Sequence, residues 1–199
     1  MGTRGVYVSG QGQFEVDEGA VLTLHQQLTV NGTLHKAGAG TLALGGPVAF
    51  NANTAQPTTG KNLLAVHAGM VQAIATNSLD GLTMSFDAGT SVRIDPAATG
   101  AVADCGFVAA KTATPFDFAN CPNGKVPVSF ALPDDYEEHK HTLTAAICTV
   151  PASTGLTPAS FAVAQPSGTR TAVTARANAD GTVTYLASIG AAGFTVLIR

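Results

Sequence analysis

The chain lacks tryptophan and contains few aromatic and few charged residues. Phe, Trp and Tyr make up 6% of its 199 residues, and Asp, Glu, Lys and Arg make up 12%, about half the charged fraction of an ordinary soluble domain. Sugar-binding sites and single-strand-binding sites commonly stack their ligands on flat aromatic rings. The composition therefore disfavours carbohydrate binding, and it predicts a surface covered by Thr, Ser, Asn and Gly rather than by ion pairs.

Basic residues and long apolar runs are scarce as well. Ten Lys and Arg are spread thinly along a chain of net charge −3, so no basic stripe can neutralise phosphates, and we exclude nucleic acid as a partner. No apolar run reaches about 18 residues, which predicts that the chain has no transmembrane segment. Because the chain has no P-loop, G-x-S-x-G or H-E-x-x-H motif, we expect no cofactor and no catalytic residue of those kinds.

Cysteine is used three times, always in the second half of the chain. None of the spacings is the C-x-x-C of a zinc ribbon, so metal binding through thiolates is not expected. In an exported protein, Cys105 and Cys121 would be candidates for a disulfide, with Cys148 left buried. The alternative is that all three are buried thiols.

Short runs of alternating apolar residues fill the first half of the chain. Such alternation is typical of β-strands, and no run of a dozen residues has helical spacing, so we predict an all-β fold. Gly or Asn separates most of the runs, and Asn31-Gly32 is predicted to be a turn between two strands. The alternating residues are Val6 and Val8, Phe14 and Val16, Leu22 and Leu24, Leu28 and Val30, Leu42 and Leu44, Val48 and Phe50, Leu64 and Val66, Met84 and Phe86, and Val92 and Ile94.

One short pattern recurs within these runs. Residues 16–22 and 86–92 both read apolar, Asp, any residue, Gly, small, any residue, apolar, and residues 66–71 form a looser third copy. A Gly at the corner permits a tight turn, while the flanking apolar residues point inward from the two adjoining strands. Strands of three to five residues joined by such turns predict a solenoid-like coil in which each turn of the chain pairs with the next.

Residues 35–46, HKAGAGTLALGG, resemble the autotransporter-associated β-strand repeat of bacterial passenger domains, which reads close to K-x-G-x-G-T-L-x-L-x-G. In that family an Asn- and Thr-rich turn leads to a second strand block. Asn51, Asn53 and Thr54 followed by residues 64–70 match this order, and the resemblance covers about residues 12–96. It implies a right-handed parallel β-helix and an extracellular or cell-surface location on a bacterium.

The composition shifts near Gly100, because all the cysteines and most of the prolines lie beyond it. We therefore predict two domains, a solenoid repeat region at 1–100 and a β-rich region at 101–199 that serves as a C-terminal cap or forms a small β-sandwich. Alternation over residues 126–132 and 183–189 predicts strands here too. A cap is expected because an open solenoid end exposes unpaired backbone.

The densest group of ionisable residues contains Glu137, Glu138, His139 and His141. On a strand, the two His would lie on one face and become candidate metal ligands. The cluster closely follows Pro133 and has no further ligand at fixed spacing, so a solvated loop is favoured and no metal site is predicted.

Asp87 and Asp95 form a second candidate pair. Paired carboxylates on a β-helix face perform acid and base chemistry in polysaccharide-processing enzymes. However, each Asp lies beside a turn residue, Gly89 or Pro96, where capping of the local backbone is the common role of Asp. We therefore favour turn capping for both.

The sequence thus favours a non-catalytic structural or adhesive protein, whose partners are copies of itself or extracellular and host surface ligands. The alternative is a β-helix polysaccharide-processing enzyme or glycan-binding module. Self-assembly into filaments would use strand edges at the two ends of the chain. The residues predicted for these edges are Val6 and Val8 at one end, and Phe194, Val196 and Ile198 at the other.

Overall fold

The computed structural model describes residues 5–45, 48–49, 63–74, 83–94, 107–108, 115–131, 142–164 and 169–191. These residues form strands β1 to β15 and four short 3₁₀-helices, and the described part of the chain contains no α-helix. The strands belong to three sheets, two of which are wholly parallel. The prediction of an all-β fold is confirmed.

The first sheet has the strand order β1-β3-β6-β8, with the short β5 also paired to β3. All of its pairs are parallel. Its strands are β1 (Val6–Glu15), β3 (Leu28–Ala37), β5 (Val48–Ala49), β6 (Leu63–Val66) and β8 (Thr83–Phe86).

The second sheet has the order β2-β4-β7-β9-β11-β13, and it too is parallel throughout. Its strands are β2 (Val21–Leu24), β4 (Thr41–Leu44), β7 (Met70–Ala73), β9 (Ser91–Ile94), β11 (Val126–Phe130) and β13 (Phe161–Val163).

The third sheet has the order β10-β12-β15-β14 and is mainly antiparallel. It contains β10 (Phe107–Val108), β12 (Leu143–Pro151), β14 (Thr169–Ala177) and β15 (Thr182–Ala191). A tight turn joins β14 to β15, where Gly181 has φ +80° and the Asp180 carboxylate accepts a hydrogen bond from the Thr182 N–H at 3.0 Å. An Asp-Gly pair is typical of such a tight turn between two strands.

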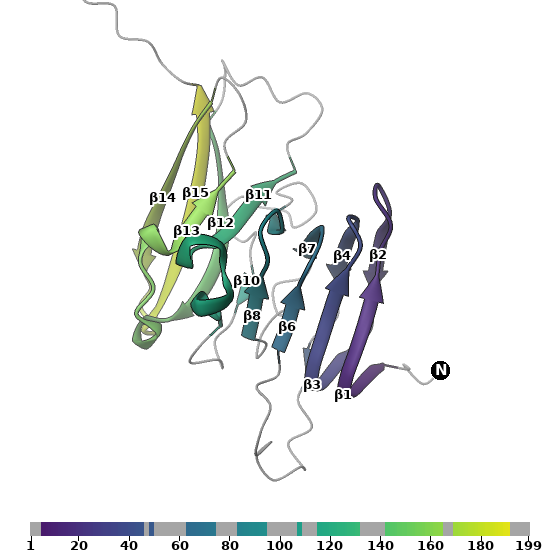
Figure 1. Cartoon of the computed structure of the whole chain (residues 1–199). Helices are drawn as coiled ribbons and strands as arrows, with labels where there is room; N and C mark the ends of the chain where they lie inside the picture. Colours follow the sequence, from purple (N-terminus) through teal and green to yellow (C-terminus); the bar gives the residue numbers. More distant parts are fainter. Residues whose placement is uncertain are drawn as a thin grey trace, which may run out of the picture.

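The chain alternates between the two parallel sheets. It runs through β1 and β2, then β3 and β4, then β6 and β7, and then β8 and β9, so each such pair, here called a rung, adds one strand to each sheet (Figure 1). Strand order is the same as chain order in both sheets. Each rung therefore hydrogen-bonds to the next one along the chain.

Parallel register stacks apolar side chains between the two sheets. In the first sheet Leu34 pairs with Leu64 and Leu64 with Met84, and all three are fully buried. Leu42, Val71 and Val92 form the matching column of the second sheet. Burying each side chain of this size contributes about 1.5–3 kcal/mol, so these columns are the main source of stability of the rungs.

Strand length differs from the prediction in the first two rungs. β1 and β3 have 10 residues each, because the predicted Asn31-Gly32 turn between strands is wrong and these residues lie inside β3. Gly32 pairs with Gly10, and a Cβ on Gly32 would lie 2.0 Å from the Gly10 carbonyl oxygen. Two stacked glycines thus let both strands bend together, which joins two short alternating runs into one strand.

Strands from the second half of the chain extend the second sheet. Val128 of β11 pairs with Val92 of β9 and with Val163 of β13. The rings of Phe161 in β13 and Tyr185 in β15 then lie 5.1 Å apart, which brings the third sheet against the second. Residues 95–106 around the predicted boundary at Gly100 lie outside the described part, and the division into two domains stays a prediction.

The turns between the sheets also stack on one another. Gly69 has φ +71°, and a Cβ there would lie 2.2 Å from the carbonyl oxygen of Gly40 in the preceding rung. Gly89 occupies the same position in the next rung with φ +84°, and a Cβ there would meet nothing within 4 Å. The two glycines share a left-handed backbone but differ in the space around it.

This difference predicts unequal effects of alanine. Both Gly69→Ala and Gly89→Ala place a side chain in the left-handed region, at a cost of about 1–3 kcal/mol. Gly69→Ala must in addition push two rungs apart, so we expect it to lower the free energy of unfolding by clearly more than Gly89→Ala in urea titrations. Equal losses would show that the Gly69 turn has room for a methyl group.

Candidate functional site

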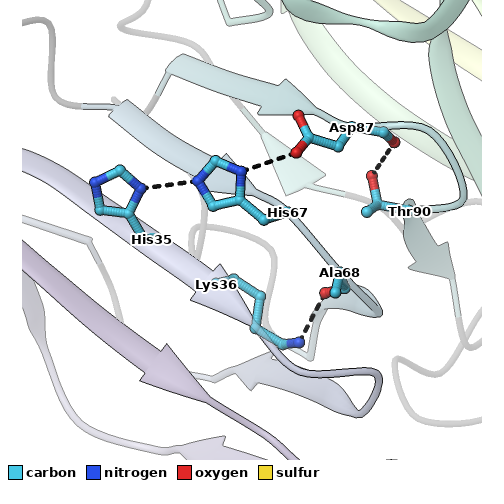
Figure 2. A network of polar contacts seen from close by, with 6 residues as sticks. All are labelled: His35, Lys36, His67, Ala68, Asp87 and Thr90. Atoms are coloured by element: carbon cyan, nitrogen blue, oxygen red, sulfur yellow. Dashed lines mark hydrogen bonds and ion pairs between the residues drawn. The ribbon is translucent and has the colours of Figure 1, made fainter.

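A chain of three polar side chains crosses successive rungs on the first sheet (Figure 2). Nδ1 of His35 lies 2.9 Å from Nε2 of His67, and Nδ1 of His67 lies 2.9 Å from Oδ2 of Asp87. His35 is in β3, while His67 and Asp87 directly follow β6 and β8. The three residues, here called the His–His–Asp chain, are 32 and 20 positions apart in the sequence.

Backbone pairing brings these side chains together. The His67 N–H donates to the Lys36 carbonyl at 2.9 Å, and the Asp87 N–H donates to the Val66 carbonyl at the same distance. Each residue is therefore held by the strand of the preceding rung. The two imidazole rings are nearly parallel, with centroids 5.2 Å apart and an angle of 16° between their planes.

The hydrogen bonds determine where the imidazole protons lie. A carboxylate only accepts, so His67 donates from Nδ1 to Asp87. In the neutral ring, Nε2 of His67 then carries a lone pair and accepts the Nδ1–H of His35. In a Ser-His-Asp triad the corresponding nitrogen faces a nucleophile, whereas here it faces a second imidazole. Nε2 of His67 is therefore better placed to bind a ligand or to exchange a proton than to activate a nucleophile for acyl transfer.

Asp87 was predicted to cap its own turn, and the structure assigns that role to its backbone instead. The Asp87 carbonyl accepts from the Thr90 hydroxyl at 2.8 Å, whereas its carboxylate bonds His67. The side-chain cap is therefore wrong for Asp87. Its proposed partner Asp95 lies outside the described residues, as do Glu137, Glu138, His139 and His141, so neither candidate group can be placed.

Lys36 has a structural role in the turn that the sequence did not predict. Its side chain is fully buried between Phe14 and Val66 in register. Its Nζ donates to three carbonyl oxygens, those of Ala37 at 2.9 Å, Gly38 at 2.6 Å and Ala68 at 2.9 Å. Figure 2 shows the bond to Ala68. Burial lowers the pKa of Lys36. The ammonium thus joins its own turn to that of the next rung.

Replacing this ammonium tests its role. Lys36→Met keeps an unbranched apolar stem but removes the donor for three carbonyls, so we expect the free energy of unfolding to fall by about 1.5–3 kcal/mol, the usual contribution of a hydrogen bond to a charged group. The matched control is Lys125→Met, because Lys125 is exposed and should change stability little. Equal unfolding midpoints in urea would refute a structural role for the Lys36 ammonium.

Two cysteines lie among the described residues, and both are buried. Burial raises the pKa of the Cys121 thiol and, more strongly, that of the Cys148 thiol. The predicted partner of Cys121, Cys105, lies outside the described part of the chain, so the disulfide stays a prediction. Cys148 is buried, as expected both for a Cys105–Cys121 disulfide with Cys148 left over and for three buried thiols.

Cys148 should be inert in the folded protein, because the thiolate is the reactive form and burial disfavours it. Iodoacetamide at pH 8 should leave Cys148 unmodified in the native protein and alkylate it fully after unfolding in guanidinium, as read from peptide masses. Rapid modification of native Cys148 would show that the third sheet opens readily. Cys121, which is 8% exposed, provides an internal comparison for the extent of alkylation of Cys148 in the same sample.

Two open hollows lie on the described surface. One, of about 450 Å³, includes Phe118, Lys125, Leu156 and Thr157 in its lining, and the other, of about 240 Å³, is lined by Val6, Thr23, Leu24, His25 and Gln26. Among the described residues, no carboxylate lines either of them. A polysaccharide-processing enzyme needs a cleft with acidic groups, so these two hollows offer that alternative no support.

Comparisons with known proteins identify no relative. No family model matches the chain, and no curated protein or solved structure matches it significantly. Within the described residues, no group of three or more His, Cys, Asp or Glu side chains has the geometry of a metal site. None of the described helices is long and apolar enough to cross a membrane.

Proposed function

We propose that this protein is a non-catalytic structural or adhesive module of the bacterial cell surface, built as a right-handed β-solenoid of the passenger type. The observation that carries the proposal is the rung order, in which every passage of the chain adds one strand to each of two parallel sheets. Such quasi-one-dimensional folds present long repetitive surfaces rather than a single cleft.

The role of Lys36 supports the resemblance to the autotransporter-associated repeat. In the pattern K-x-G-x-G, the Lys supplies a buried ammonium for three turn carbonyls. The first Gly is Gly38, where a Cβ would lie 2.2 Å from the Val16 carbonyl oxygen. The residue types of the motif thus match the physical needs of one stacked turn.

The third sheet is proposed to cap the solenoid. The second sheet ends at β13. There the Phe161 ring lies edge-on to Phe116, with centroids 6.1 Å apart, and is tilted against Tyr185 of the third sheet, with centroids 5.1 Å apart. A sheet end covered in this way has less unpaired, apolar surface exposed to water. The third sheet is mainly antiparallel and so does not continue the wholly parallel pattern.

The opposite end of the solenoid is open in the described chain. β1 and β2 are the terminal strands of their sheets, and the side chains of Tyr7 and Val21 are 56% and 58% exposed. The partner that fits such an edge is a further strand. We propose that a second copy of this chain supplies it, for which residues Phe194, Val196 and Ile198, outside the described part, remain the predicted complement.

The backbone of β1 provides a sharp test. The Val6 N–H donates to Gln27 at 2.9 Å, toward β3, so the next amide, that of Tyr7, faces the free edge. Tyr7→Pro removes this edge donor and is tolerated on an edge strand. Tyr7→Ala removes the side chain but keeps the donor. If strand addition drives assembly, light scattering should show self-association for Tyr7→Ala and little for Tyr7→Pro.

Two other outcomes are informative. Equal assembly of wild type, Tyr7→Pro and Tyr7→Ala would contradict assembly through β1. Monomer at all concentrations for the wild type would refute self-assembly and leave adhesion to surface ligands as the remaining form of the proposal. Circular dichroism of each variant checks that the sheets are retained.

A further inference from the structure

The geometry points to a metal-binding site that is separate from the proposed structural function. We propose that His35 and His67 together bind one divalent transition-metal ion, with Cu²⁺ or Ni²⁺ preferred, and that Asp87 orients His67 for this purpose. The ligands would be Nδ1 of His35 and Nε2 of His67, which are hydrogen-bonded at 2.9 Å and would turn to face the ion together. Water would fill its remaining coordination positions.

The hydrogen bond to Asp87 prepares His67 as a ligand. Metal-binding His commonly donates its other ring N–H to a carboxylate, which fixes the tautomer and makes the ligating nitrogen more basic. Nδ1 of His67 makes such a bond to Asp87 at 2.9 Å. This leaves the lone pair of Nε2 directed at His35. Asp87 is therefore a positioning residue rather than a ligand.

Metal binding replaces the proton that joins the two rings. Without metal, this proton is carried by Nδ1 of His35 and shared with Nε2 of His67. When the ion binds, the proton moves through solvent to Nε2 of His35, so that both nitrogens facing the ion carry lone pairs and both imidazoles stay neutral. No co-reactant is required, and the net change is the exchange of water ligands for two imidazoles.

The distance between the two nitrogens indicates which ions fit. The two nitrogens now face each other across a hydrogen bond of 2.9 Å, with ring centroids 5.2 Å apart, so both rings must turn toward the ion. If the nitrogens keep this separation, metal–nitrogen bonds of about 2.0–2.1 Å give an angle of about 90° at the ion. That is the angle between neighbouring ligands in the tetragonal geometry of Cu²⁺ and Ni²⁺, whereas tetrahedral Zn²⁺ needs a wider one. Cu²⁺ also binds nitrogen ligands most strongly among the divalent first-row ions.

The site is both anchored and accessible. β3 pairs with β6 on either side of His35, which limits the movement of the ligands, and χ2 of His is a soft torsion that lets each ring turn toward the ion. The side chains of His67 and Asp87 are 45% and 58% exposed, so hydrated ions can reach them. A bound ion would join two successive rungs outside the core.

The test titrates the full-length protein with CuSO₄ at pH 7.5 and follows binding by calorimetry and by electron paramagnetic resonance. We expect one site with coupling to two imidazole nitrogens, reduced to one or none in His35→Ala and in His67→Ala. Asp87→Asn should keep both nitrogens but weaken binding by about 10- to 100-fold. Ni²⁺ should compete with Cu²⁺ more effectively than Zn²⁺ does.

Two controls separate this site from other imidazoles. His25→Ala removes an exposed His elsewhere on the fold and should leave Cu²⁺ binding unchanged. The double variant His139→Ala/His141→Ala should do the same. Retained two-imidazole binding in a folded His67→Ala protein, or loss of binding in either control, would overturn the assignment. Stronger competition by Zn²⁺ than by Ni²⁺ would overturn the choice of ion.

Discussion

In both parallel sheets, each strand hydrogen-bonds to the strand that follows it one rung later, and this single register decides which side chains meet. It aligns Leu34 with Leu64 and Leu42 with Val71 in the core. It also brings His67 beneath His35 on the outside, because the His67 amide bonds to the β3 backbone. Core packing, the turn stack and the His–His–Asp chain all depend on it.

The turns show how the fold places a charge in its interior. A buried ammonium is costly unless it is fully hydrogen-bonded, and Lys36 meets this condition with three carbonyl oxygens. Two of these belong to its own turn and one to the next rung. The same group therefore donates hydrogen bonds to carbonyls of two adjacent turns and links these turns to each other.

The strands could largely be predicted from the sequence, because the alternation of apolar residues directly reflects the two faces of each strand. β14 was missed, since its Thr, Ala and Arg residues carry little apolar signal. Asn31-Gly32 was misjudged, because a Gly pair can bend two adjacent strands as well as reverse one. The His–His–Asp chain could not be predicted: His35 and His67 are 32 positions apart and meet only because of the strand register, which the residues between them do not reveal. The K-x-G-x-G spacing could have suggested the role of Lys36.

The pairings between rungs also differ in length, and this affects how the protein would respond to force. β1 pairs with β3 over ten positions, whereas β6 pairs with β8 over four. Backbone hydrogen bonds point along the stacking axis, so tension along that axis loads the junctions between rungs in series. The short junctions would then open first, and the β1–β3 pair would remain as the strongest link of an extended rod.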